Sequence, residues 1–131
     1  MKVRNKDLPA LSNVQLEIMN VIWEKGEATV TDVWEEIKKK RDVARTTIMT
    51  LMARLEEKGW LKHKTVSPTF IYSATRLKDE SAGKIVSGIL DKVFHGSTEN
   101  LVMALLDHNK VSREELSRIG NIVKQAERGK L

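Results

Sequence analysis

The sequence predicts a mainly α-helical protein with a small β-hairpin: a winged helix-turn-helix followed by a region of three helices. Two changes of pattern carry this prediction. Apolar residues recur at helical spacing in three segments before residue 59, then alternate as in strands from residue 60 to residue 74. Helical spacing returns after residue 78. The 131 residues suffice for one domain or two very small ones.

The composition excludes several classes of protein. Apolar residues make up 40% and charged residues 31%, which is unlike a disordered or fibrous chain. No stretch approaches the roughly 18 consecutive apolar residues of a membrane span. The basic N-terminus is not followed by the apolar segment of a secretory signal, so we expect a cytoplasmic protein. The absence of cysteine excludes a disulfide scaffold, a cysteine-ligated metal site and a thiol enzyme.

Capping signals locate the first two helices. Ser12 and Gln15 have the spacing of a capping box, and Gly26 is predicted as the C-terminal cap of the same helix. The second helix opens at Thr29 or Thr31, and its last turn runs into a basic segment that suits a helix C-terminus. The apolar stripes of these helices contain Val14, Ile18, Val21, Ile22, Val30, Val33, Trp34 and Ile37.

The third helix has an apolar stripe and an unusual face opposite it. The stripe is Ile48, Leu51, Met52 and Leu55, and Gly59 follows as a C-terminal cap. The opposite face carries small hydroxyls and arginines in place of the glutamate–lysine mixture of an ordinary solvated helix. Its helix propensity is low, so we expect this surface to be retained for a reason other than helix stability. The residues of this face are Arg45, Thr46, Thr47, Met49, Thr50, Ala53 and Arg54.

A β-hairpin is predicted after the third helix. Residues 60–64 and 70–74 alternate as two short strands around a turn at 66–69. Two strands alone are marginally stable, so we expect the hairpin to pack against the helices. Lys62 and Lys64 lie on one face of the first strand.

The net charge of +5 is concentrated around the third helix and the hairpin. Residues 38–64 contain nine basic and three acidic residues, a net charge of +6. Such a segment is either an ordinary solvated face or an electrostatic surface for nucleic acid. Its basic residues are Lys38, Lys39, Lys40, Arg41, Arg45, Arg54, Lys58, Lys62 and Lys64.

Nothing in the sequence supports an enzyme, a cofactor or a metal site. His63, His95 and His108 lack the spacing of metal ligands, and the glycines form no phosphate-binding loop. A small hydrolase or metal enzyme is the rival from this class, and stoichiometric zinc in the purified protein would support it. Three tryptophans are predicted as core residues at element ends: Trp23, Trp34 and Trp60.

The last 54 residues contain three apolar stripes that are too rich for three short helices to bury against one another. Ser112 and Glu115 are predicted to cap the last of these helices. The surplus apolar surface favours a second copy of the chain as its partner. The predicted dimer contacts are Ile85, Ile89, Val93, Leu101, Leu105, Leu116 and Ile119.

The third helix and the hairpin have the side chains that DNA readout requires. The major groove, about 12 Å wide, admits a helix with short side chains and a few long donors. The threonines can donate to phosphates or pack their methyl groups on thymine, and the arginines can reach phosphate or guanine. The two lysines lie along the DNA backbone, while Met49 either contacts bases or fills a gap near the second helix. The predicted DNA contacts are Arg45, Thr46, Thr47, Met49, Thr50, Arg54, Lys62 and Lys64.

Several segments carry a resemblance to a known family. Along the third helix these are Ala44-Arg45-Thr46-Thr47-Ile48, Thr50-Leu51, Arg54-Leu55 and Lys58-Gly59. Elsewhere they are Glu17-Ile18-Met19, Ile22-Trp23, Lys92-Val93-Phe94, Gly96 and Leu101-Val102. Over roughly residues 8–124, the chain resembles the penicillinase-repressor (BlaI/MecI-like) family, which also includes CopY-like copper regulators.

The resemblance implies a homodimeric transcriptional repressor. Residues 1–77 are then a winged-helix domain that binds a near-palindromic operator, and residues 78–131 a helical dimerisation domain. Resistance-linked members answer β-lactams through a membrane sensor protease, and repression ends when that or a downstream protease cuts the dimerisation part. The matching position is Ala104–Leu105, where those members have Asn-Phe. The copper-responsive members use a cysteine cluster, which this chain lacks.

A second function class stays open at this point. Winged helices also bind protein or RNA partners through basic faces, without operator specificity. Operator binding with a two-fold footprint separates the two hypotheses.

Overall fold

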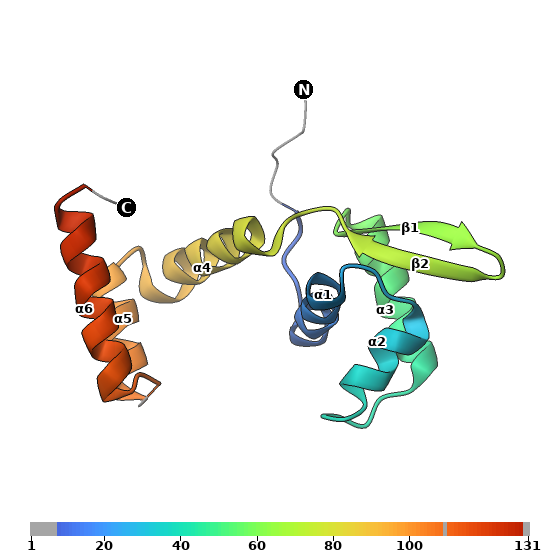
Figure 1. Ribbon diagram of the computed structural model, residues 1–131, viewed down its shortest axis with the longest axis horizontal. Helices are drawn as coiled ribbons and strands as arrows, with labels where there is room; N and C mark the ends of the chain where they lie inside the picture. The colour runs from blue at the N-terminus through green and yellow to red at the C-terminus, as the bar shows by residue number, and fades with distance from the viewer. Residues whose placement is uncertain (1–7, 109, 130–131) are drawn as a thin grey trace. The chain divides into compact units, whose positions relative to one another are not determined.

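The computed structural model of the protein describes residues 8–108 and 110–129 (Figure 1). Within them, a two-stranded antiparallel sheet directly follows the third of six helices. This order confirms the predicted fold class. The elements are α1 (Asn13–Lys25), α2 (Val30–Ile37), α3 (Arg45–Glu57), β1 (Leu61–Val66), β2 (Thr69–Ala74), α4 (Lys78–Phe94), α5 (Thr98–Asp107) and α6 (Arg113–Glu127).

The chain divides into two compact units, Met1–Ile85 and Val86–Leu131, so the division falls within α4. The first unit contains α1, α2, α3 and the hairpin, and the second contains α5 and α6. Among the described residues, no helix is both long enough and apolar enough to cross a membrane.

Local sequence signals begin and end the first helices. The Ser12 hydroxyl accepts a hydrogen bond from the Gln15 N–H at 3.2 Å, and the Gln15 side chain accepts one from the Ser12 N–H at 3.0 Å. This is the predicted capping box. Gly26 ends α1 at a φ of 85°, a left-handed value that glycine adopts without steric cost. A second capping box, Thr29 with Asp32, begins α2 at the first of its two predicted positions.

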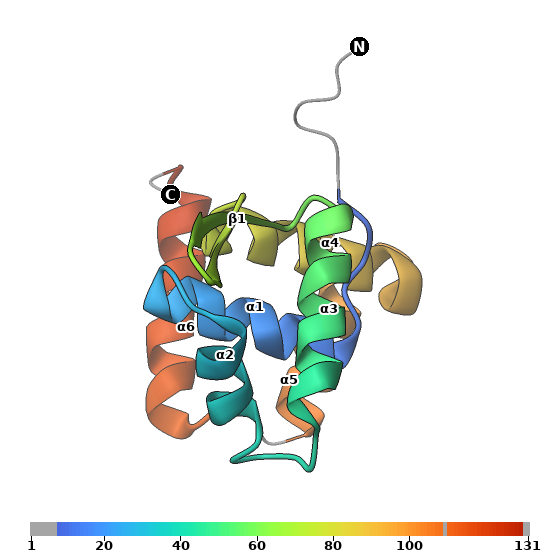
Figure 2. The ribbon, with the colours of Figure 1, turned by 90° about the vertical axis from the view of Figure 1, so that its right-hand side faces the viewer.

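The core of the first unit lies between the three helices and the base of the hairpin. Helix α3 packs against both α1 and α2, and Figure 2 shows it upright beside α2. Ile48, Met52 and Leu55 of α3 are fully buried, and Leu51 lies half-buried at the edge of this stripe. The other fully buried large side chains are Ile18, Met19, Ile22 and Val33.

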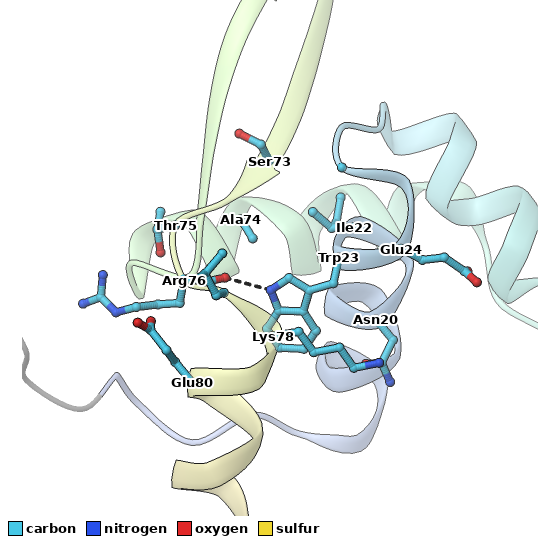
Figure 3. A pocket seen from close by; sticks show the side chains of 12 residues that line it. Asn20, Ile22, Trp23, Glu24, Ser73, Ala74, Thr75, Arg76, Lys78 and Glu80 are labelled. Atoms are coloured by element: carbon cyan, nitrogen blue, oxygen red, sulfur yellow. Dashed lines mark hydrogen bonds between the residues drawn. The ribbon is translucent and has the colours of Figure 1, made fainter.

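Trp60 is a core residue, as predicted, while Trp23 and Trp34 are half-buried and pack against the core. Each of the three also holds a loop. All three indole N–H groups donate to backbone carbonyls at 2.9 Å. Trp23 meets Trp60 edge to face, with ring centroids 6.5 Å apart. The indole of Trp23 donates to the carbonyl of Arg76, which holds the segment after β2 against α1 (Figure 3). Burying these rings leaves no indole donor unpaired.

The hairpin, which we call the wing, leans on the helices at its base. Its strands pair from Leu61 with Ala74 to Val66 with Thr69. Ala28 and Tyr72 exchange two backbone hydrogen bonds at 2.9 and 3.0 Å, so the loop between α1 and α2 extends the sheet. The side chains of Leu61 and Tyr72 are buried in the core. These contacts supply the support that the sequence predicted two strands to need.

The turn predicted at 66–69 is confirmed, because Val66 pairs with Thr69 across a two-residue connection. The basic segment 38–41 follows the C-terminus of α2 as a turn, in which the N–H groups of Lys40 and Arg41 both donate to the carbonyl of Ile37. The predicted strand bounds are wrong: the strands cover 61–66 and 69–74 in place of 60–64 and 70–74. Trp60 precedes β1, and its N–H donates to Leu55 in α3.

The second unit exposes its apolar residues. Ser112 caps α6 as predicted, accepting from the Glu115 N–H at 3.0 Å, and Ser97 caps α5. Among the described residues of this unit, no side chain is fully buried. Its exposed large apolar residues are Val86, Ile89, Val93, Val102, Met103, Leu105, Leu106, Leu116, Ile119, Ile122 and Val123.

We expect Leu55→Ala to lower the free energy of unfolding by about 2–5 kcal/mol, because it removes a fully buried side chain and leaves a cavity. Urea unfolding followed by tryptophan fluorescence measures this loss. The control is Met49→Ala on the exposed side of α3, which should change stability by less than about 0.5 kcal/mol. Equal losses in both variants would contradict the assigned inward face of α3.

Candidate nucleic-acid interface

Burial of one side of α3 presents the other side to solvent. All six α3 residues predicted to contact DNA are exposed. They flank or oppose the buried Ile48, Met52 and Leu55, whose spacing sets the rotation of the helix. The exposed set is Arg45, Thr46, Thr47, Met49, Thr50 and Arg54.

Two side chains of this face already have partners within the protein. The Nε of Arg45 donates to the Thr31 hydroxyl at 2.8 Å, which ties the start of α3 to the start of α2. The Thr50 hydroxyl donates to the Thr46 carbonyl one turn earlier, at 3.1 Å. The proton of Thr50 thus serves the helix, and its methyl group and oxygen lone pairs face outward.

Met49 is the residue with two predicted roles. It is 45% exposed and lines a groove together with Ala53, Phe70 and, at the start of α2, Val30. Contact with bases and filling of a gap near α2 both remain predictions for it. The groove gives the outer face of α3 an apolar strip suited to methyl or sugar contacts.

The wing presents its two predicted cations differently. Lys62 is exposed and, within the described residues, makes no ion pair. Lys64 lies 3.1 Å from a carboxylate oxygen of Glu27, which comes from the loop between α1 and α2. Arg54 on α3 resembles Lys62, being exposed and without an ion pair in the described part of the chain. Among the predicted DNA contacts, the cations without an ion pair in the described chain are therefore Arg45, Arg54 and Lys62.

Two of the four cations in the basic turn after α2 are paired with carboxylates. Arg41 forms a two-pronged ion pair with Glu17, at 3.1 and 2.6 Å. Lys39 pairs with Glu36 at 3.2 Å, and the Lys38 ammonium lies 4.0 Å above the Trp34 ring. The segment of net charge +6 thus divides into a turn tied to α1 and α2 and a less compensated region on α3 and the wing.

Sequence reasoning missed a cluster that joins α3 to the wing. The Nδ1 of His63 lies 2.8 Å from both carboxylate oxygens of Glu56. The His63 ring stacks on Phe70 with centroids 4.0 Å apart and planes 13° from parallel, and it also meets Tyr72 at 5.6 Å. His63 pairs with Tyr72 across the hairpin, so Phe70 is its diagonal neighbour. The register of the hairpin brings His63 beside Tyr72 and Phe70, and the packing of β1 against α3 brings it to Glu56.

The pKa of Tyr72 is sensitive to this cluster. Burial raises the pKa of its phenol above the usual 10.0, and the negative charge of Glu56 raises it further. The folded chain therefore holds this proton more tightly than the unfolded chain does. The resulting stabilisation is complete below about pH 10 and is lost as the pH rises through the folded pKa.

The chain is similar in sequence to known proteins over most of its length. The sequence profile of the family described as "Penicillinase repressor" matches residues 11–125. The chain belongs to the penicillinase repressor family. The methicillin resistance regulatory protein MecI of Mammaliicoccus sciuri is 30% identical over 113 residues, covering 86% of this chain and 92% of MecI. The penicillinase repressor of Bacillus licheniformis is 26% identical over 120 residues, covering 92% and 94%.

A solved structure matches a little over half of this chain. The DNA-binding domain of the repressor BlaI superposes with a TM-score of 0.51 and 31% identity, covering 57% of this chain and 92% of that domain. This agreement confirms the winged helix-turn-helix. Members of the family are transcriptional regulators, so the prediction that the chain is not an enzyme is also confirmed. Among the described residues, no group of histidine and acidic side chains could hold a metal ion.

We expect Glu56→Gln to lower the pKa of Tyr72 towards its usual value without reaching it, because burial is the larger cause and remains. The near-ultraviolet absorbance of the phenolate measures this, since Tyr72 is the chain's single tyrosine. Glu57→Gln removes the same charge at the next, exposed position and should leave the titration unchanged. Equal shifts in both variants would rule out the contact with Glu56 as the cause.

Proposed function

We propose that the protein is a homodimeric transcriptional repressor that binds a near-palindromic operator through α3 and the wing. The observation that carries the proposal is the outer face of α3, where short hydroxyl side chains lie between two arginines and the opposite face is buried. In this proposal residues 1–77 are the DNA-binding domain and residues 78–131 the dimerisation domain.

The side chains of α3 fit the two parts of a DNA contact. Thr46 and Thr47 are exposed and short enough to let the helix backbone approach base edges in the major groove. Arg54 is exposed and, within residues 8–108 and 110–129, has no ion-pair partner to give up, so it suits a phosphate or a guanine. Arg45 keeps its terminal guanidinium nitrogens for the same use, while its Nε stays on Thr31.

The wing supplies backbone contacts beside that groove. Lys62 is exposed and unpaired within the described chain, and Lys64 exchanges Glu27 for phosphate. That exchange costs little, because both partners are more than half exposed and solvent screens their attraction. Met49 and Phe70 line the groove between helix and wing and offer apolar contact to thymine methyl groups or sugars.

The relatives support the same assignment. BlaI is described as a repressor with a DNA-binding domain, and this domain is the part of it that the present chain matches in structure. MecI is described as a regulatory protein of methicillin resistance and matches over most of both chains. We assign β-lactam resistance as the class of regulation on this basis.

Dimerisation through the second unit explains its exposed apolar faces. On α5, Leu101 and Leu105 lie on one side, Val102 and Leu106 about a quarter turn away, and Met103 beyond them. A helix that is apolar around more than half of its circumference needs partners on more than one side. A second copy supplies them without any further protein. The proposed contacts are Ile85, Ile89, Val93, Leu101, Leu105, Leu116 and Ile119.

Release by proteolysis fits the same arrangement. A cut between Ala104 and Leu105 falls inside α5, no residue of which is buried in the single chain. It would detach the last three residues of α5 and all of α6 from the rest of the dimer contact. A membrane sensor protease, or a protease downstream of it, is the proposed partner.

The test is to select duplexes from random DNA with the full-length protein and to footprint the enriched sequence. We expect two protected half-sites about one helical turn apart, roughly 34 Å. We also expect Arg54→Ala to weaken binding about tenfold at about 0.1 M salt and to flatten the salt slope by about one, as one lost phosphate contact does.

The matched control is Arg118→Ala, which removes the same charge from α6. Affinity and salt slope should then be unchanged on the same duplex. An unaltered slope in Arg54→Ala would remove Arg54 from the interface. Enrichment of no duplex by the unaltered protein would overturn the repressor proposal in favour of a protein or RNA partner.

For the dimer, we expect Leu101→Asp with Leu105→Asp to yield monomers in sedimentation and to weaken binding to the full site about 10²–10⁴-fold. The loss arises because the second half-site contact stops being intramolecular. Binding to an isolated half-site should stay the same, which controls for unfolding. Unchanged binding to the full site by a monomeric variant would separate dimerisation from operator affinity.

A further inference from the structure

The outer half of the wing has few contacts that fix its direction. Every residue from Lys64 to Phe70 is exposed, while the base of the wing is anchored by buried Leu61 and Tyr72. A two-stranded ribbon without other support twists and bends readily. Something at the boundary between these halves must set the angle between the wing and α3.

His63 occupies that boundary. It is the last residue of β1 that is not exposed, and it lies on the face of the strand that looks towards the helices. Its Nδ1 is 2.8 Å from both oxygens of Glu56, in the last turn of α3. Its ring lies parallel to Phe70 at 4.0 Å, which extends the contact to the outer part of β2. A continuous set of contacts thus runs from α3 to the exposed half of the wing.

Among the described residues, the wing makes one other side-chain ion pair with the helical part, besides the backbone pair of Ala28 and Tyr72 at its base, and this ion pair is weaker. Lys64 reaches Glu27 on the opposite face of β1, with both side chains more than half exposed. The side chains of His63 and Glu56 are 26% and 34% exposed, so solvent screens their attraction less. Within the described residues, Glu56 and His63 form the less exposed polar link between α3 and the wing.

We infer that Glu56 and His63 are positioning residues that hold the wing at the angle to α3 at which both can contact one duplex. The inference rests on the proposed function. Lys62 and Lys64 flank His63 in β1, so the place of His63 fixes where both cations lie along the DNA backbone. Phosphate contacts set the register of a protein on a duplex. Loss of the bond between Glu56 and His63 therefore displaces the wing from the DNA backbone, while α3 keeps its own contacts in the major groove.

The test compares hydroxyl-radical footprints of full-length variants on the duplex selected by the unaltered protein. In Glu56→Ala and in His63→Phe, we expect the protection at the outer flank of each half-site to be lost and that at its centre to persist. The salt slope should fall by about one, because a lysine of the wing loses its phosphate. His63→Phe keeps an aromatic ring against Phe70, so its loss isolates the bond to Glu56.

Two controls separate position from charge and from folding. Glu57→Ala removes an equal charge from the next residue, which is exposed and makes no ion pair in the described chain, and should keep the whole footprint. Glu56→Gln retains an acceptor for the Nδ1 proton and should restore the flank protection. Melting temperatures show whether each variant is folded at the temperature of the footprint.

The possible outcomes separate the positioning role of Glu56 and His63 from the proposed function. Full flank protection in both Glu56→Ala and His63→Phe would overturn the positioning role while leaving operator binding intact. Uniform weakening at centre and flank would overturn it too, because it would indicate general destabilisation. Failure of the unaltered protein to enrich any duplex would overturn the proposed function itself.

Discussion

The burial of one stripe of α3 is the constraint on which the rest of the site depends. Ile48, Met52 and Leu55 have no exposed surface, and each occupies a core shared with α1, α2 and the base of the wing. A helix has one rotation that buries three such residues, so the directions of Thr47 and Arg54 follow from it. Packing to interior density keeps this rotation from drifting. The outer face of α3, which we propose contacts DNA, is thus a consequence of the core.

Internal ion pairs decide which of the many cations remain for a ligand. Arg41 is held by Glu17, Lys39 by Glu36 and Lys64 by Glu27, all at the surface. Such pairs add little stability, but they lower the positive charge offered to solvent at those points. Within the described residues, Arg45, Arg54 and Lys62 remain without an ion pair on α3 and the first strand of the wing, and Lys40 remains without one in the turn after α2. A net charge of +5 for the whole chain conveys none of this distribution.

The sequence predicted what depends on neighbours along the chain. Capping at Ser12 and Ser112, the C-terminal cap at Gly26 and the buried stripe of α3 all rest on spacings of four residues or fewer, or on helical periodicity. It could not predict contacts set by the register of the hairpin. Glu56 and His63 meet because β1 begins at Leu61 after a turn at Gly59, and a shift of one residue would turn His63 to the other face. Helical periodicity alone predicts the apolar faces of the second unit, but it does not predict which partner covers them.

The first unit buries its apolar side chains and the second exposes them, and this difference connects structure to regulation. The first unit buries a complete core and pairs each of its indole donors, so its contact face is ready before any ligand arrives. The second unit leaves apolar faces such as those of Leu105 and Ile119 open to solvent in the single chain. Pairing of two copies would bury those apolar faces and hold two preformed α3 faces together. Binding to a two-fold DNA site would then depend mainly on dimerisation of the protein and little on any change within the first unit. A signal that acts on the second unit could then control DNA binding without altering one atom of α3.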